Sequence, residues 1–300
     1  MTIAHWTVDD FFEDAQAMRA AIDQHFDESR SGQLPFDQRA IWNYWYVDKT
    51  YTYLRAMPQR MYPGPHQAFM KKLALFAAWE FGMGVPSGPY LSMYVAGCGQ
   101  AIHNDAKNGR LAYVYSLTRW AERHFDGGET IVFKLKQPSR TEAAATTNFY
   151  DLIEPVFNRL LVFDDRIAHG VRPISGTMNP HDARFVVHGH LCETPRIAFT
   201  QGGLKDISLD APWVALREDI SALMRDGGQH GFITFEATVA QTGQTQSAGF
   251  KHVQLFPTSD QARDAESLAT EALRRIGAAV WPVAAGPSRL VFAVSSNPIA

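Results

Sequence analysis

The sequence predicts a mainly β fold with flanking helices over residues 1–194, followed by a small α+β domain over residues 213–300. Short apolar runs, bounded by turn residues, follow one another from Tyr90 to Leu191. Apolar residues recur at helical spacing before Tyr90, and the pattern changes again after Thr194. Many short strands with helices packed outside them are typical of a jelly roll, the cupin-like double-stranded β-helix.

Two helices are expected before the strands. Thr7-Val-Asp-Asp10 has the form of a capping box, and apolar residues follow it every three or four positions. A second helical pattern covers residues 66–81, after Pro63-Gly-Pro65, and ends at Gly82. We expect this second helix to support the larger sheet.

An aromatic segment, residues 41–54, lies between these helices and has high strand propensity. Its aromatic content is far above the 12% of the whole chain. These rings either pack in the core at one end of the barrel or form the wall or lid of a substrate pocket. The sequence leaves both interpretations open.

The strands expected in the central region alternate with loops. Residues 138–150, rich in Ser, Thr and Ala, are expected to form a surface loop. The strand predictions cover residues 91–94, a strand ending near 103, and residues 110–117, 129–135, 159–163 and 183–191.

The C-terminal part is expected to form a separate domain after a linker at residues 195–212. Helices are predicted at 213–224 and 259–276, and strands at 232–240, after the Thr242-Gly243 turn, and at 289–294. The order ββαβ faintly resembles the small C-terminal domain of TonB-type proteins. We expect this domain to serve dimerisation or the binding of substrate or a partner.

Composition narrows the class of protein. Of 300 residues, 46% are hydrophobic and 20% charged, and the net charge is −3, without the basic patches that nucleic-acid binding requires. No apolar run approaches the roughly 20 residues of a membrane span, and no secretory signal is visible. The chain has two cysteines, which argues against a disulfide framework. These features predict a cytoplasmic protein that binds neither nucleic acid nor membranes.

Three side chains have the pattern of a metal centre. His103 and Asp105 are two residues apart at the end of an alternating run, so they point to the same side of a strand. His169 lies in a later strand that can pair with the first. Two imidazoles and one carboxylate occupy one face of an octahedron and leave three positions open, as in non-haem Fe(II) oxygenases.

Residues 90–191 resemble the catalytic core of Fe(II)/2-oxoglutarate-dependent oxygenases, in their prolyl-hydroxylase-like branch. The matching motifs occur in the family's order: Tyr94 to Gly97, His103-x-Asp105, Gly127 to Phe133, Ile153 to Phe163, His169-x-Val171 and Arg184-Phe-Val-Val. The resemblance implies Fe(II) as cofactor and 2-oxoglutarate and O2 as cosubstrates. It also implies that His103, Asp105 and His169 are the metal ligands.

The far carboxylate of 2-oxoglutarate requires a buried cation that binds in a bidentate manner, which suits arginine. The resemblance implies Arg184, although it follows His169 by more residues than in the family. Arg172 is the competing candidate. The resemblance also implies that Tyr94 contacts the keto acid or the substrate, and that Ser116 contacts the far carboxylate.

Further residues are candidates for substrate contact. His188 and His190 share a strand face with Arg184 because even offsets point the same way. His190 is expected to line the barrel mouth and touch the substrate, and Tyr113 is a second candidate. His188 and His190 also have the spacing of a metal pair, but a second metal is not expected beside the better-matched set.

The predicted function is hydroxylation of an unactivated C–H bond in an amino acid, a peptide or a natural product, with succinate and CO2 as co-products. The presence of Asp105 favours hydroxylation over halogenation, because related halogenases carry a small residue there. Desaturation and cyclisation remain open, as does a homodimer. The alternative is a non-catalytic protein that uses the same scaffold to bind a metal, a keto acid or a regulatory partner.

Overall fold

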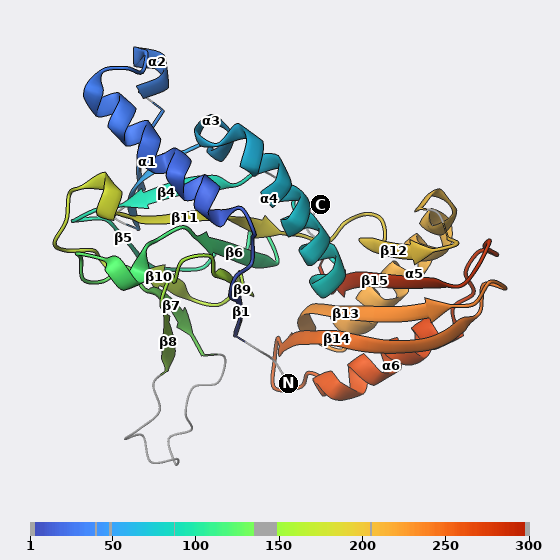
Figure 1. Cartoon of the computed structure of the whole chain (residues 1–300). Coiled ribbons are helices and arrows are strands. Elements are labelled where there is room, and N and C mark those ends of the chain that lie inside the picture. Colours follow the sequence, from blue (N-terminus) through green and yellow to red (C-terminus); the bar gives the residue numbers. More distant parts are fainter. Residues whose placement is uncertain are drawn as a thin grey trace. The chain divides into compact units, whose positions relative to one another are not determined.

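The structure is a computed structural model that describes residues 4–39, 41–47, 50–86, 88–134, 149–204 and 206–297. Most of the loop expected at 138–150 lies outside these residues. The described chain divides into two compact units, and Figure 1 shows their elements. We call Ala4–Lys72 with Ser87–His190 the β-helix unit, and Leu73–Pro86 with Leu191–Ala300 the C-terminal unit.

Within the described residues, eleven strands form one sheet in the β-helix unit, in the order β1-β9-β6-β11-β4-β3-β5-β10-β7-β8, with β2 paired to β3. The strands are β1 (His5–Val8), β2 (Asn43–Val47), β3 (Tyr51–Ala56), β4 (Tyr90–Tyr94), β5 (Gly99–His103), β6 (Leu111–Ser116), β7 (Thr130–Phe133), β8 (Tyr150–Ile153), β9 (Leu160–Asp164), β10 (His169–Val171) and β11 (Arg184–Leu191). Side chains from β2 to β7 and from β9 to β11 line one cavity, because the sheet curls around it. This is the double-stranded β-helix that the sequence predicts.

Helix α1 (Ala15–Ser31) lies beside β4 and β11 in Figure 1. Its Arg19 is fully buried: the guanidinium carbon is 4.8 Å from the centre of the Phe185 ring, and Nη1 donates to the carbonyl of Leu117 at 3.1 Å. The helix ends at Gly32, whose φ of 77° suits glycine. These contacts fix α1 on the outside of the sheet.

The capping box expected at Thr7–Asp10 does not begin a helix. Thr7 and Val8 belong to β1, which pairs antiparallel with β9, and α1 begins only at Ala15. The edge of β9 offers backbone partners to this segment, and that pairing prevails over the local helix signal. The prediction of a helix start at this position is therefore wrong.

The short helices α2 (Phe36–Arg39) and α3 (Pro58–Met61) lie on either side of the β2–β3 hairpin in the sequence. Helix α4 (Pro63–Phe76) follows and continues into a π-helical turn, η1 (Ala77–Phe81), which ends at Gly82. The chain divides between the two units at Lys72, within α4. The helix expected over 66–81 is thus divided between the two units, whereas the sequence predicted that it supports the larger sheet. The 3-10 turns η2 (Trp120–Glu122) and η3 (Pro180–Asp182) complete the β-helix unit.

The C-terminal unit contains a four-stranded antiparallel sheet in the order β12-β15-β13-β14, within the described residues. Its elements are β12 (Phe199–Gly202), α5 (Asp206–Asp226), β13 (Gln229–Val239), β14 (Thr245–Pro257), α6 (Ala265–Ala278) and β15 (Ser288–Ser295). The elements β13, β14, α6 and β15 follow the expected order ββαβ. β12 and the start of α5 occupy part of the segment expected to be a linker, so the unit begins earlier than residue 213.

Apolar side chains of α5, α6 and the sheet form the core of the C-terminal unit. Trp213 of α5, Phe235 of β13 and Phe292 of β15 are buried together, with ring centres 4.8 Å apart for Trp213 and Phe292 and 5.8 Å apart for Phe235 and Phe292. None of the described helices is long and apolar enough to span a membrane.

Candidate active site

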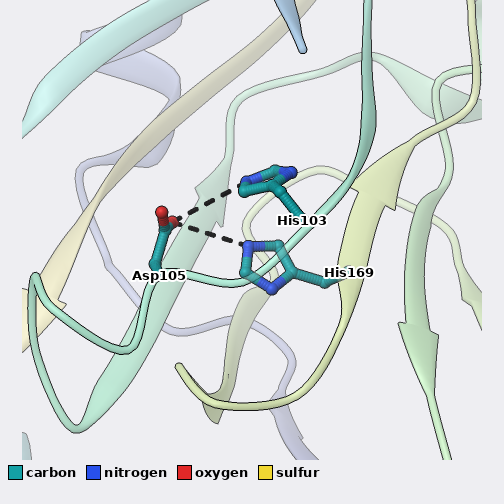
Figure 2. A group of neighbouring side chains, drawn as sticks. All are labelled: His103, Asp105 and His169. Atoms are coloured by element: carbon teal, nitrogen blue, oxygen red, sulfur yellow. Dashed lines mark ion pairs between the residues drawn. The ribbon is translucent and has the colours of Figure 1, made fainter.

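The two histidines of the predicted metal set lie directly opposite each other in the sheet. His103 ends β5 and His169 begins β10, and the two residues are paired in the antiparallel register. Their ring centres are 4.4 Å apart. Asp105 follows the end of β5, and its Oδ2 lies 3.8 Å from Nε2 of His103 and 3.5 Å from Nε2 of His169 (Figure 2). The structure therefore brings all three side chains together from two strands.

Backbone carbonyls determine which nitrogen of each histidine faces the centre. Nδ1 of His103 lies 2.7 Å from the carbonyl of Ala101, and Nδ1 of His169 lies 2.8 Å from the carbonyl of Ile167. A carbonyl only accepts hydrogen bonds, so each Nδ1 carries the proton and each Nε2 presents a lone pair. A hydrogen bond from the second nitrogen is a usual feature of metal-binding histidines.

Asp105 is held as a carboxylate. Asn108 donates to its Oδ1 at 3.1 Å, and the hydroxyl of Tyr51 donates to the same oxygen at 3.4 Å. Burial raises the pKa of Asp105, but the adjacent imidazoles of His169 and His103 outweigh burial and lower it to about 2. Burial and the neighbouring His169 lower the pKa of His103. Three lone-pair donors thus converge within 4.8 Å of one another, an arrangement that a cation stabilises.

These side chains open onto a cavity of about 590 Å³ in the β-helix unit. The cavity is also lined by the four other residues that the sequence places in the site apart from Ser116: Tyr94, Tyr113, Arg184 and His190. Further lining residues from β2 and β3 are Trp45, Tyr51, Tyr53 and Arg55. Of the two interpretations of the aromatic segment, the pocket wall therefore describes these residues, whereas Tyr44 and Tyr46 are exposed.

Arg184, the first residue of β11, is only 1% exposed and lies opposite Tyr94 of β4. Its Nη2 donates to the hydroxyl of Thr130 at 3.3 Å, and its guanidinium carbon lies 4.6 Å from the centre of the Tyr94 ring. Nε and Nη1 of Arg184 have no hydrogen-bond partner in the described structure. Burial lowers the pKa of the guanidinium. A buried cation with two free donors facing a cavity fits a carboxylate.

Arg172 does not point into the cavity. Its side chain is 45% exposed, and Nη1 forms a salt bridge with Glu129 at 2.8 Å. Arg172 follows His169 by three residues, an odd offset, so an extended chain directs it to the opposite face. Of the two arginines that the sequence leaves as alternatives, Arg184 lines the cavity and Arg172 does not.

Ser116 does not lie in the site either. Its hydroxyl donates to the carbonyl of Pro155 at 2.6 Å and accepts from the backbone N–H of Thr118 at 3.1 Å. Ser116 does not line the cavity. The expected contact with the far carboxylate is therefore not supported, and the hydroxyl next to Arg184 belongs to Thr130.

His188 and His190 both line the cavity, as their shared strand face predicts. Nδ1 of His190 lies 2.9 Å from Oδ2 of Asp165, a fully buried carboxylate, while Nε2 of His188 lies 2.8 Å from the hydroxyl of Ser92. The two histidines thus have separate partners.

Sequence reasoning missed several residues of the site. Asp165, Thr130 and Gln100 were not predicted, although Gln100 donates to the hydroxyl of Tyr94 at 2.8 Å. Gln100 lies three residues before His103 in the same strand, β5, and its polar side chain within an apolar run was a usable signal. Tyr113 was predicted, and its buried hydroxyl has no hydrogen-bond partner in the described structure.

The fold and the site define a curled β-sheet with a candidate centre of two histidines and one carboxylate. Residues 90–191 match the family model of the 2OG-Fe(II) oxygenase superfamily. This match confirms the resemblance to 2-oxoglutarate-dependent oxygenases over the segment that holds β4 to β11. The family implies Fe(II), 2-oxoglutarate and O2 as cofactor and cosubstrates.

This chain is similar to solved structures of proteins from bacteria and animals, among them the following three. A prolyl-4-hydroxylase of Pseudomonas putida is 17% identical, with a TM-score of 0.40, over 62% of this chain and 90% of its own. A prolyl hydroxylase of Trichoplax adhaerens, solved with a hypoxia inducible factor peptide, is 12% identical, with a TM-score of 0.41, over 62% and 81%. AviO1 of Streptomyces viridochromogenes is 18% identical, with a TM-score of 0.41, over 62% and 87%. No curated protein matches the sequence.

Proposed function

We propose that this protein is an Fe(II)- and 2-oxoglutarate-dependent dioxygenase that hydroxylates an unactivated C–H bond of an amino acid, a peptide or a natural product. One observation carries the proposal: the lone pairs of His103, Asp105 and His169 and the free donors of Arg184 open onto the same cavity. The first set suits a ferrous ion, and the second suits the far carboxylate of a keto acid.

Metal binding and keto-acid binding are assigned to different residues. His103, Asp105 and His169 hold the metal, because both imidazoles present Nε2 and the carboxylate is anionic. Arg184 anchors 2-oxoglutarate, with Thr130 fixing one of its nitrogens. When bound, iron, 2-oxoglutarate and O2 supply the oxidising chemistry, with succinate and CO2 as co-products.

Other residues orient these groups and shape the pocket. Asn108 and Tyr51 hold Oδ1 of Asp105 and leave Oδ2 facing the two imidazoles. Gln100 fixes the hydroxyl of Tyr94 beside Arg184. Tyr113 and His190 present polar atoms to the part of the cavity that a substrate would enter. The aromatic walls limit the access of water to this space.

Purified protein tests the proposal directly. Fe(II), ascorbate and 2-oxoglutarate are added in air, and succinate is measured with and without candidate amino acids, peptides and cyclic natural products. Iron-dependent succinate formation supports the proposal, and mass analysis of a converted substrate distinguishes hydroxylation from desaturation or cyclisation. A protein that binds neither iron nor 2-oxoglutarate contradicts it.

A protein that binds both but forms no succinate with any compound fits the alternative, a non-catalytic protein on the same scaffold. The complete ligand set favours the enzyme. The cytoplasmic location, the homodimer, and the role of the C-terminal unit in dimerisation or partner binding stay predictions.

A further inference from the structure

One wall of the cavity carries a second cation, far from the metal centre. Alternate residues of β3 face the cavity: Tyr51, Tyr53 and Arg55. The hydroxyl of Tyr51 contacts Asp105 and so marks the metal end of the wall. Arg55 is four residues further along an extended strand, so its Cα lies roughly 13 Å from that of Tyr51.

Two aromatic rings hold the guanidinium of Arg55. Its central carbon lies 3.7 Å from the centre of the Trp45 ring and 3.9 Å from the centre of the Tyr90 ring, and both rings line the cavity. Burial raises the pKa of the Tyr53 hydroxyl to about 12, and the nearby Arg55 partly opposes this rise. The rings cover the two faces of the guanidinium, so its N–H groups, which lie along the edge, are left to form hydrogen bonds.

Arg55 forms no salt bridge with any described residue of the chain, and neither does Lys107, which also lines the cavity. Among the described lining residues, the cations are Arg55, Lys107 and Arg184, and the only carboxylate is Asp105. The two charges of a ferrous ion cancel those of the 2-oxoglutarate dianion, and Arg184 cancels Asp105. Arg55 and Lys107 then remain without a counter-charge.

We propose that Arg55 binds a carboxylate at the end of the substrate remote from the oxidised carbon. This inference rests on the proposed function and names its substrate class: carboxylic acids with an apolar or cyclic body, such as an amino acid or a short peptide with a free C-terminus. Tyr53, Tyr90 and Val186 line the space for that body. A planar guanidinium edge matches a carboxylate better than it matches a point charge.

Three probes with the same body test this inference: 4-phenylbutanoate, its amide and 4-phenylbutyl phosphate. Their affinities are measured by calorimetry, without oxygen, on protein loaded with Fe(II) and 2-oxoglutarate. We expect the acid to bind at least about tenfold more tightly than the amide, because a charge-assisted pair of hydrogen bonds replaces neutral ones. Equal affinities of acid and amide, no binding by the acid, or tighter binding of the phosphate would overturn it.

Variants assign the effect to Arg55. Arg55→Gln keeps a planar polar group but removes the charge and shortens the side chain, and it should abolish the preference for the acid. Arg55→Lys should restore only part of it, because an ammonium cannot bind in a bidentate manner. Arg39→Gln is the matched control, since Arg39 is exposed on α2 and does not line the cavity. An acid preference that survives in Arg55→Gln contradicts the inference.

Different results would contradict the proposed function and the Arg55 site. Succinate formation by a protein that binds acid and amide equally leaves the proposed function standing and removes the inference. A protein that shows the Arg55-dependent acid preference but no succinate formation retains the anion site and loses the enzymatic proposal. A separate titration of 2-oxoglutarate into the wild type and Arg55→Gln, each loaded with Fe(II) alone, shows whether Arg55 or Arg184 holds the keto acid.

Discussion

The interiors of the two units differ in the groups that they bury. Every buried charged or imidazole side chain among the described residues lies in the β-helix unit: Arg19, Arg110, Asp164, Asp165, His169 and Arg184. The described buried polar side chains of the C-terminal unit are uncharged Ser, Thr and Gln, around an apolar core. Buried charge is costly unless it is paired, so a unit that retains it does so for a reason other than stability.

The buried charged groups of the β-helix unit are of two kinds. Arg19 is paired with Asp23, and Asp164 with Arg166, so the cost of burying these charges is offset within the fold. Arg184 and His169, by contrast, present free donors or lone pairs to the cavity. Substitutions of the cavity-facing groups in the β-helix unit should therefore change catalysis more than folding. Substitutions in the core of the C-terminal unit should change folding more than catalysis.

The largest effect is expected at the metal centre. His103→Ala and Asp105→Ala should each abolish iron-dependent succinate formation, because two remaining ligands do not hold the ion in its geometry. Succinate and bound iron are measured, and thermal unfolding without metal serves as the control for folding. Either variant retaining wild-type turnover would remove the assignment of the ligands.

The next effect is expected at Arg184. Arg184→Ala should raise the KM for 2-oxoglutarate by about two to four orders of magnitude, because breaking a buried charge pair costs about 3–5 kcal/mol. Arg172→Ala removes an exposed arginine and is the matched control, with a KM close to that of the wild type. The reverse result would move the anchoring role to Arg172.

A third prediction tests the other side of the comparison. Phe235→Ala should lower the free energy of unfolding of the C-terminal unit by about 3–5 kcal/mol, because it leaves a cavity beside Phe292. Denaturant unfolding measures the loss, and the affinity for 2-oxoglutarate should stay unchanged. A folded variant that no longer binds 2-oxoglutarate would show that this unit contributes to the site.

The smallest effect concerns pH. Burial raises the pKa of Asp165 from 3.8 to about 6, against the opposing effect of His190. The pKa of His190 is also raised: burial lowers it, but Asp165 outweighs burial. Both groups bind protons more tightly in the folded protein than in the unfolded protein. The stability that this difference contributes is present below pH 4, and it is lost as the pH rises through 6 and above. For Asp165 this amounts to about 1–3 kcal/mol in the metal-free protein.

Asp165→Asn is the variant that isolates this contribution. Its free energy of unfolding, measured between pH 4 and 7 in the presence of a chelator, should fall less with pH than that of the wild type. An identical pH profile in both proteins would contradict the raised pKa of Asp165.

The parts of the site that the sequence predicted share one property: their signals are local. His103 and Asp105 are two residues apart in a strand, and Arg184 opens an apolar strand, so each could be read without knowledge of the sheet. His169 required only the assumption that its strand pairs with that of His103. The register confirms that pairing.

The parts that were missed depend on contacts between distant segments. Ser116 lies at the end of β6, where the sequence places a contact with the far carboxylate, but its hydroxyl donates to the carbonyl of Pro155 in a later loop. Asp165 reaches the site because the backbone N–H of Asp105 donates to its carbonyl at 2.9 Å. The start of α1 was misplaced because β1 pairs with β9. No local pattern contains this information.

The carbonyls of Ala101 and Ile167 that orient the two histidines have one more consequence. They are main-chain atoms, so no side-chain replacement at those two positions can delete the acceptors. The sequence around the centre is thus free to diverge while the imidazoles keep their tautomer. Evolution can alter the specificity of this pocket without first having to preserve a supporting shell of side chains around the histidines.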